Sequence, residues 1–457
     1  MDDKNDFTKG NIPKSILALA IPMTLAQLIN ILYNVVDRMY IARIPDASTM
    51  ALTGIGVTFP IITIVMAFAN LFGMGGAPLC SIERGRGNNK KAEQIMGNSF
   101  CLLLICGVLL TILGLIFKKP FLFLLGASDS TFSYANNYIT IYLLGSVFVM
   151  ISLGMNSFIN CQGFAKIGML TVFLGAIINI LLDPIFIFIL HMDVKGAALA
   201  TIISQFLSAA WVLRFLTGKK TILKLKAENF KLKPVLLKRI TTLGLSGFIM
   251  ALTNSIVQIV CNTTLVNYGG DLYIGVMTVL NSIREVVSMP VGGINNGSQP
   301  VIGFNYGAKK YNRVKGGIKF MSIVCIGYTT FIWIILRLFP ESFISLFASE
   351  SHLIEAAVPA LNIYFFGFFM MSLQFSGQST YIALGKSKHA IFFSLLRKII
   401  IVVPLVLFLP KMFNLGVVGV FLAEPISNFT GGLACYLTML ITVWPNLKED
   451  KKIKLPA

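Results

Sequence analysis

Two acidic residues inside long apolar segments are the positions at which this chain could carry out chemistry. Asp37 lies in the stretch LAQLINILYNVVDRMYIA, and Asp183 lies in the stretch TVFLGAIINILLDPIFIFIL. A carboxylate inside a membrane costs about 2.5–3.5 kcal/mol even on the lenient insertion scale, so it is a functional-site candidate by default. The second half of the chain has Cys261 and Val403 at the corresponding positions. Because only one of the two duplicated halves has these acids, we predict that they form an ion-coupling site. For Asp37 the alternative is a structural role, in an ion pair near the outer surface.

The surroundings of Asp183 offer several oxygen ligands. Asn179 precedes it by four residues and therefore lies on the same face of a helix. Pro184 has no amide hydrogen, so the carbonyl of Ile180 is left without its helical donor. Thr201, in the GAALAT stretch that follows, can add a hydroxyl. Such a cluster can hold a proton or a small hard cation such as Na⁺. The alternative is a structural aspartate that Asn179 satisfies.

A polar stripe runs along the first apolar segment and recurs in the second half. Gln27, Asn30 and Asn34 repeat at intervals of three and four residues, and Asn254 and Gln258 repeat the stripe. Polar side chains are costly in lipid, so they should face a water-filled cavity or hydrogen-bond to a partner helix. Methionine side chains are flexible and adapt to apolar ligands of varied shape, so Met155 and Met289, near polar residues, are included. We predict a substrate cavity lined by Gln27, Asn30, Asn34, Met155, Asn156, Asn254, Gln258, Met289, Gln374 and Gln378.

Other charges within apolar segments are interpreted as structural. Arg284 and Glu285 are expected to form an interhelical pair, and Glu424 is expected to stabilise a kinked helix start. Arg397 and Lys398 are expected near the cytosolic third of their helix.

The elements that must position these residues are membrane helices. The chain has 457 residues, of which 56% are hydrophobic and 12% charged, with a mean hydropathy of +0.79. Apolar runs of roughly 20 residues, long enough to cross a ~30 Å hydrocarbon core, recur about twelve times. This predicts an all-α polytopic membrane protein with twelve transmembrane helices. Their approximate spans are 15–43, 52–80, 94–117, 135–158, 167–191, 195–217, 239–266, 272–302, 316–339, 358–381, 390–410 and 415–443.

The net charge of +19 is concentrated in alternate loops. This is the positive-inside pattern, which predicts a multi-pass protein of the plasma (inner) membrane with both termini cytoplasmic, and it argues against a nucleic-acid partner. The seven cysteines have no metal-ligand spacing. With no nucleophile elbow, HExxH or Walker loop, the sequence predicts neither an enzyme nor a cofactor.

The two halves align as an internal repeat. Pro78 matches Pro300 at an offset of 222, and Pro184 matches Pro404 at 220. Six spans in each half, an even number, predict parallel repeats related by an axis along the membrane normal. We expect residues 1–217 to form an N-lobe of helices 1–6, residues 218–238 a basic cytoplasmic linker, and residues 239–457 a C-lobe of helices 7–12 with a cytoplasmic tail. The linker is expected to lie at the membrane interface as an amphipathic helix, or to be solvated.

The stretch GGINNGSQPVIGFNYGAKKYNRV (residues 292–314), the NxxxDP motif, the GAALAT stretch and the duplication together resemble the MATE multidrug and toxic compound extrusion family, in its DinF/MepA-like branch. The resemblance implies an antiporter with a V-shaped pair of bundles that expels organic cations in exchange for H⁺ or Na⁺. It places the cation-coupling site at Asp37, Asn179, Asp183 and Thr201, which would be metal ligands if Na⁺ is the coupling ion. Acids that another branch has on helices 7 and 10 are missing here, which argues against a coupling site in the C-lobe.

The predicted function is therefore cation-coupled multidrug efflux by alternating access. The expected partners are amphipathic organic cations and membrane lipid, and the expected state is a monomer. H⁺ is favoured over Na⁺, although the residues could serve either ion. The runner-up is a flippase for lipid-linked precursors, which would need a basic cavity; Arg38 and Arg284 are its only candidates. A membrane scaffold or receptor has no use for acids confined to one half.

Overall fold

The computed structural model describes residues 5–44 and 48–448. Within these ranges the chain is helical and has no strand. The rest of the predicted cytoplasmic tail, residues 449–457, lies outside them.

The membrane spans agree with the predicted number. Among the described residues, nine helices are long and apolar enough to cross a membrane, and two further spans are pairs of helices bent by 55° and 52°. The first pair is α4 (Asp129–Leu144) with α5 (Ser146–Asn160), and the second is α11 (Ser351–Tyr364) with α12 (Phe368–Ala383). The 74-residue α8 (Pro234–Gly307) is interrupted at Gly270, where φ is 66°, so it supplies two spans. The prediction of an all-α protein with twelve spans is confirmed.

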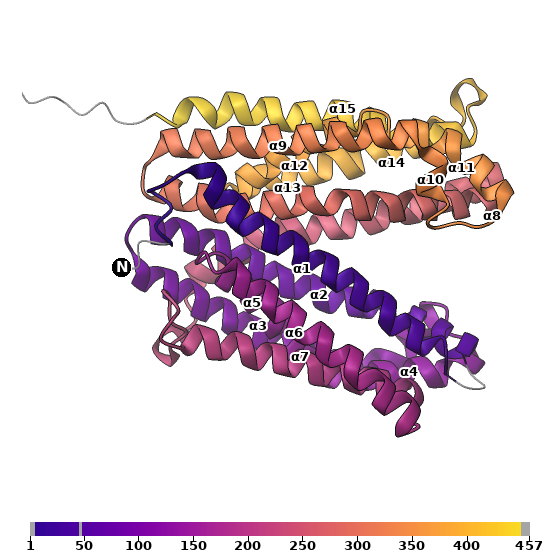
Figure 1. Ribbon diagram of the computed structural model, residues 1–457, viewed down its shortest axis with the longest axis horizontal. Coiled ribbons are helices and arrows are strands. Elements are labelled where there is room, and N and C mark those ends of the chain that lie inside the picture. Colours follow the sequence, from indigo (N-terminus) through magenta and orange to yellow (C-terminus); the bar gives the residue numbers. More distant parts are fainter. Residues whose placement is uncertain (1–4, 45–47, 449–457) are drawn as a thin grey trace, which may run out of the picture. The chain divides into compact units, whose positions relative to one another are not determined.

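The first compact unit consists of residues 21–244. It takes in most of α1 and the beginning of α8, and its helices run side by side (Figure 1). Small residues permit this close packing: a Cβ atom on Gly244 would lie 1.7 Å from the carbonyl oxygen of Leu71, so only glycine lets the two backbones touch there. The remaining elements of the unit are α1 (Ile12–Ile41), α2 (Ser48–Gly85), α3 (Asn89–Leu124), α6 (Ala165–Pro184), the π-helix η2 (Ile185–Ile189) and α7 (Asp193–Thr217).

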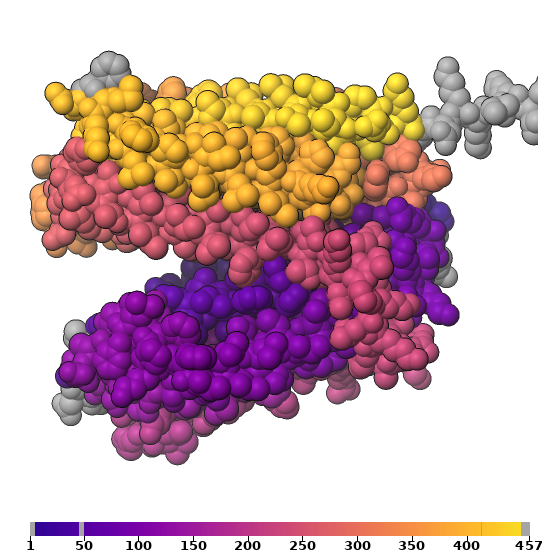
Figure 2. Space-filling view, turned by 180° about the vertical axis from the view of Figure 1, so that it is seen from behind, coloured from indigo at the N-terminus to yellow at the C-terminus, as the bar shows by residue number. Residues whose placement is uncertain are grey.

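The second compact unit consists of residues 1–20 and 245–457. The N-terminal segment is anchored in it by Arg313 and Asn305, both of which donate hydrogen bonds to the carbonyl of Phe7. Side chains fill the spaces between the helices of this unit, whose later helices are orange and yellow in Figure 2. Its further elements are α9 (Tyr311–Leu338), α10 (Pro340–Ile344), α13 (Ser387–Leu395), the π-helix η4 (Leu396–Val402), α14 (Val403–Phe408) and α15 (Val417–Thr442).

The internal repeat is visible in local structure. Helix α2 ends at Gly85 and α8 at Gly307, and the following helices begin at Asn89 and Tyr311, all at the offset of 222. Both connecting loops contain one left-handed residue at the same place. It is Gly87 (φ 77°) in the first half and Lys309 (φ 57°) in the second. The two halves therefore share a loop conformation although the residue type differs.

The basic linker forms no long amphipathic helix. Residues 218–233 contain only the short 3₁₀-helix η3 (Ala227–Phe230), and the segment packs on the first unit. The Oε1 atom of Gln162 accepts hydrogen bonds from the amides of Ile222 and Leu223 at 2.9 and 2.7 Å. Asn98 accepts a further bond from the amide of Lys233 at 2.8 Å. Buried amide side chains therefore hold the linker in place.

Candidate ion-coupling and substrate site

The backbone is irregular next to Asp183. Because Pro184 cannot donate a helical hydrogen bond, α6 gives way to the π-helix η2, in which the amide of Leu190 bonds to the carbonyl of Ile185 at 2.9 Å. π-Helical turns occur frequently at functional sites. Asp183 itself is fully buried. The sequence therefore places a carboxyl group at the point where its helix is widened.

Asn179 connects Asp183 to the neighbouring helix. Its Nδ2 atom lies 3.4 Å from Asp183 Oδ1 and 3.4 Å from Thr201 Oγ1. Thr201, on α7, also donates to the carbonyl of Ala197 at 3.0 Å. Asn179 is thus in contact with both Asp183 and Thr201 in the interior of the first unit.

The fourth predicted residue, Asp37, approaches from α1. Its carboxyl group is within side-chain hydrogen-bonding range of Asp183. In the described part of the chain, three buried oxygens of this group accept no hydrogen bond: Asp37 Oδ1, Asp183 Oδ2 and Asn179 Oδ1. Two neighbouring carboxyl groups with unmet acceptors need a shared proton or a cation between them. The neighbouring guanidinium, that of Arg38, lies over the ring of Phe59, 4.7 Å from its centre.

Three tyrosines complete this acidic cluster, and the sequence reasoning missed them. Tyr33 interacts electrostatically with Asp37 and Asp183, and Tyr138 interacts with Asp37 and Thr201. Tyr138 stacks on Tyr142, with ring centres 6.4 Å apart. A signal was available for one of them, because Tyr33 precedes Asp37 by four residues and so shares a helix face with it.

A cavity of about 210 Å³ adjoins the cluster within the first unit. Of the predicted residues, Gln27, Asn30 and Asn156 line it. Tyr33 lines it as well, and so connects the cavity to the two carboxyl groups. The other polar lining residues, not predicted, are Ser152, Thr171, Ser204, Gln205 and Ser208.

Two residues of this unit that were predicted to line the cavity, Asn34 and Met155, are not among its lining residues. Asn34 donates a hydrogen bond to the carbonyl of Asn30 at 2.7 Å, within α1. Met155 is fully buried in α5 and does not line the cavity. A methionine beside an asparagine in the sequence points to a different face of the helix, because consecutive residues do not share one.

The predicted residues of the second half lie in the second unit. Gln374 and Gln378 are buried and donate to the carbonyls of Phe393 and Ala390, at 3.3 and 3.4 Å, which ties α12 to α13. Met289 is also buried. Asn254 and Gln258 line a separate small cavity, of about 20 Å³, within this unit.

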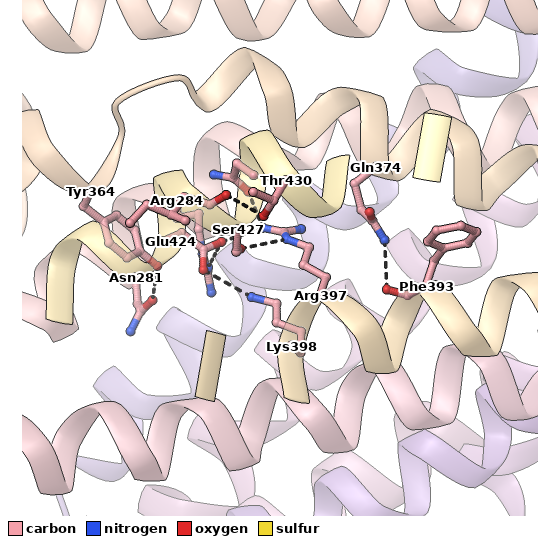
Figure 3. A network of polar contacts seen from close by, with 12 residues as sticks. Asn281, Arg284, Tyr364, Gln374, Phe393, Arg397, Lys398, Glu424, Ser427 and Thr430 are labelled. Atoms are coloured by element: carbon pink, nitrogen blue, oxygen red, sulfur yellow. Dashed lines mark hydrogen bonds and ion pairs between the residues drawn. The ribbon is translucent and has the colours of Figure 1, made fainter. Parts of the chain in front are cut away.

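The expected pair of Arg284 with Glu285 was wrong. Arg284 bonds instead to Glu424, with Nη1 3.3 Å from Oε1, and Glu285 is exposed. Adjacent residues on a helix point in different directions, so the partner had to come from another helix. Arg397 and Lys398 belong to the same buried network around Glu424 (Figure 3).

The comparison with protein families separates the chain into the same two halves. The MatE family model matches residues 22–185 and again residues 247–408. The chain belongs to the MatE family. As a MatE protein it is a multi-pass membrane transporter and not an enzyme.

The MatE protein has relatives and structural neighbours over nearly its whole length. It is 26% identical over 434 residues to the multidrug export protein MepA of Staphylococcus haemolyticus, with 94% of each chain covered. It is 24% identical over 437 residues to MepA of Staphylococcus aureus, with 94% and 95% covered. A crystal structure of MATE in the bent conformation matches with a TM-score of 0.92 and 22% identity, over 97% of this chain and 98% of that one, which shows the shared fold.

Proposed function

We propose that this MatE protein is a multidrug efflux antiporter that exports amphipathic organic cations in exchange for protons. The observation that carries the proposal is the convergence of Asp37 and Asp183 from two apolar helices, with buried carboxylate oxygens that accept no hydrogen bond among the described residues. The names of the relatives, multidrug export proteins, support the class of transport.

The proposed coupling follows from the charge of this pair. Desolvation favours the neutral form of a carboxyl group, so the pair can take up and release a proton. Loss of the proton leaves negative charge beside the 210 Å³ cavity, where it attracts an organic cation. Protonation from outside removes that attraction and favours release of the drug. One pH unit supplies about 1.4 kcal/mol, and 100 mV about 2.3 kcal/mol per charge moved.

The cavity wall suits a flat cationic substrate. Tyr33, Gln27 and Asn30 line the same cavity. Aromatic faces attract cations, and amide groups can reorient to fit varied ligands. A volume of about 210 Å³ is below the usual ~300–1,000 Å³ of a drug-sized pocket. We infer that this unit binds part of the substrate.

Sodium is the alternative coupling ion at the same residues. The described residues contain no group of three or more His, Cys, Asp or Glu that could hold a metal. Na⁺ would therefore need Asn179 and Thr201 as ligands beside the two carboxylates. The amide nitrogen of Asn179 is directed at Asp183 and Thr201, and a donor in that place favours a proton over a cation.

The flippase alternative gains three basic residues in the second unit, the partly exposed Arg284 and the buried Arg397 and Lys398. All three bond to Glu424, and the adjoining cavity of about 20 Å³ is far too small for a pyrophosphate group. These contacts support drug export over flipping. We further propose that the protein acts as a monomer with both termini cytoplasmic, and that the linker joins an N-lobe to a C-lobe.

The test is efflux of ethidium from proteoliposomes under an imposed pH gradient or an imposed Na⁺ gradient. Transport on the pH gradient alone is the expected result. Transport that requires Na⁺ would make the acidic cluster a metal-ion site. No transport under either gradient, from protein that is folded and inserted, would contradict the proposal and favour the flippase.

A further inference from the structure

The second unit contains a buried cluster with an excess of positive charge. Glu424, near the start of α15, accepts Arg397 Nη2 at 2.6 Å and Arg284 Nη1 at 3.3 Å on one carboxylate oxygen. Its other oxygen lies 3.5 Å from Lys398 Nζ. The three cations come from α8 and η4, and Figure 3 shows them directed at the single carboxylate. Among the described residues, Glu424 is the only acid in these ion pairs.

Three cations around one carboxylate leave two positive charges that no carboxylate balances, although Arg397 also donates hydrogen bonds to the neutral side chains of Ser427 and Asn428. Arg397, Lys398 and Glu424 are all buried, within segments apolar enough to cross a membrane. A charge in such surroundings is costly unless it is paired, and a buried ion pair repays its desolvation only when further bonds satisfy it. An anion beside the cluster would supply the missing negative charge.

A cavity of suitable size lies beside these cations. It has a volume of about 20 Å³, and Lys398, Arg284 and Glu424 form part of its wall. A single water needs about 10–15 Å³ on this measure, so the space holds one small particle and no polyatomic ligand. The exposed Asn254 and Gln258 also line it, which leaves the cavity open on that side.

Two further residues of the cavity wall, Tyr364 and Asn281, are arranged so that a hydrogen-bond donor is left for a ligand. Tyr364 donates its hydroxyl hydrogen to Asn281 Oδ1 at 3.2 Å. That contact uses the acceptor end of the Asn281 amide and leaves its N–H₂ group available to a ligand. Tyr364 is held in turn by the guanidinium of Arg284, 5.7 Å from the centre of its ring. Ammonium, guanidinium and amide N–H groups in one small space are complementary to an anion.

We infer that this cavity is a binding site for one monoatomic anion, which in the cell is chloride. Lys398 and Arg284 supply its charge, and the amides of Gln258 and Asn281 supply neutral donors. The site lies in a different unit from the proposed coupling residues, so it does not depend on the proposed exchange of protons for drugs. Its role is to balance the charge of the cluster and thereby to stabilise the packing of α8, η4 and α15.

Binding can be measured without transport. Purified protein in detergent is transferred from sodium gluconate to sodium chloride at constant total salt, and its melting temperature and its binding of radiolabelled chloride are recorded. Gluconate is too large for the cavity. A saturable rise in melting temperature with chloride, and with bromide, is expected, because a ligand that binds only the folded state stabilises it.

The decisive variant is Lys398→Gln, with Lys220→Gln as its control at an exposed position. Chloride affinity should fall about 10- to 100-fold in Lys398→Gln, the range that corresponds to one charge-assisted hydrogen bond. Lys220→Gln should bind chloride as the unmodified protein does. If Lys398→Gln does not fold, Gln258→Leu, at an exposed position, should still weaken chloride binding several-fold. Equal melting temperatures in chloride and gluconate with no bound chloride, or unchanged affinity in the variant that folds, would overturn the inference.

Discussion

The two units of this MatE protein combine a duplicated backbone with opposite polar chemistry. In the first unit, two carboxyl groups meet and three buried oxygens accept no hydrogen bond among the described residues. In the second, three basic side chains surround one carboxylate that they saturate. At the offset of 220, Asp183 corresponds to Val403 and Glu424 to Ser204. The second half has therefore exchanged an acceptor-rich interior for a donor-rich one, not merely dropped its acids.

The irregular backbone is common to both units, but its position differs. A π-helix follows Pro184 in the first unit, whereas a π-helix precedes Pro404 in the second. A proline in a membrane helix frees a carbonyl in either case. The side chains next to it differ: the widened turn adjoins a pair of carboxyl groups in the first unit and carries two cations of an ion-pair cluster in the second.

The largest effect should come from removing the acids of the first unit. Asp37→Asn and Asp183→Asn should each abolish gradient-driven ethidium efflux, by about 100-fold or more, because neither amide can carry the coupling proton. The measurement is efflux from proteoliposomes. Asp129→Asn, at an exposed position of α4, is the control and should transport normally. Near-normal efflux in both variants would remove the distinction between the two units.

Removing the acid of the second unit should act on stability. Glu424→Gln leaves three cations without their shared partner, and breaking a buried pair in this way costs about 3–5 kcal/mol. The melting temperature of the purified protein should fall well below that of Glu350→Gln, whose side chain is exposed. Stable Glu424→Gln protein with lost efflux would instead assign this carboxylate a role in transport.

A matched pair of tyrosines sharpens the comparison. Tyr33 lies beside the acids, and Tyr364 donates a hydrogen bond to Asn281 in the basic unit. Tyr33→Phe should slow efflux several-fold with little change in melting temperature, since its hydroxyl adjoins the carboxyl pair. Tyr364→Phe should cost about 1 kcal/mol of stability, the usual worth of one hydrogen bond, and leave efflux rates close to normal. Equal effects of the two substitutions on efflux would show that both units take part in coupling.

The smallest effect concerns the linker, which packs on the acidic unit. Gln162→Leu removes the oxygen that accepts the amides of Ile222 and Leu223 and leaves them without that partner, a loss of about 1–3 kcal/mol. We expect faster proteolysis between residues 218 and 233 and unchanged efflux per folded molecule. Gln94→Leu, which loses only an exposed hydrogen bond from Lys233 Nζ at the end of the linker, should change proteolysis less. Unchanged proteolysis in Gln162→Leu would mean that the linker is held by its apolar contacts alone.

Much of the architecture could be read from the amino-acid sequence. The length of the apolar runs predicted twelve spans, because an apolar helix must match the thickness of the membrane. The spacing of Asn179 and Asp183 placed them on one helical face, and they are in contact. The resemblance to the MATE family was confirmed by the match of its model to both halves.

Contacts between distant segments could not be read in this way. Arg284 was assigned to its neighbour in sequence, yet its partner, Glu424, is 140 residues away. The same limit explains why Tyr138 was missed, because its contact with Thr201 forms only when α4 packs on α7. The linker likewise depends on the side-chain amides of Asn98, in α3, and of Gln162, in the turn after α5, which no local pattern connects to it.

The sequence by itself determined the class of the protein, its spans, its repeat and the rare charges in its apolar segments. Those features follow from hydrophobic length and from helical spacing, which are local properties of the chain. Only the tertiary structure decided which charges meet. It joined Asp37 to Asp183 in one unit and gathered three cations on Glu424 in the other, because the packing of helices far apart in the chain selects the partners of a buried charge.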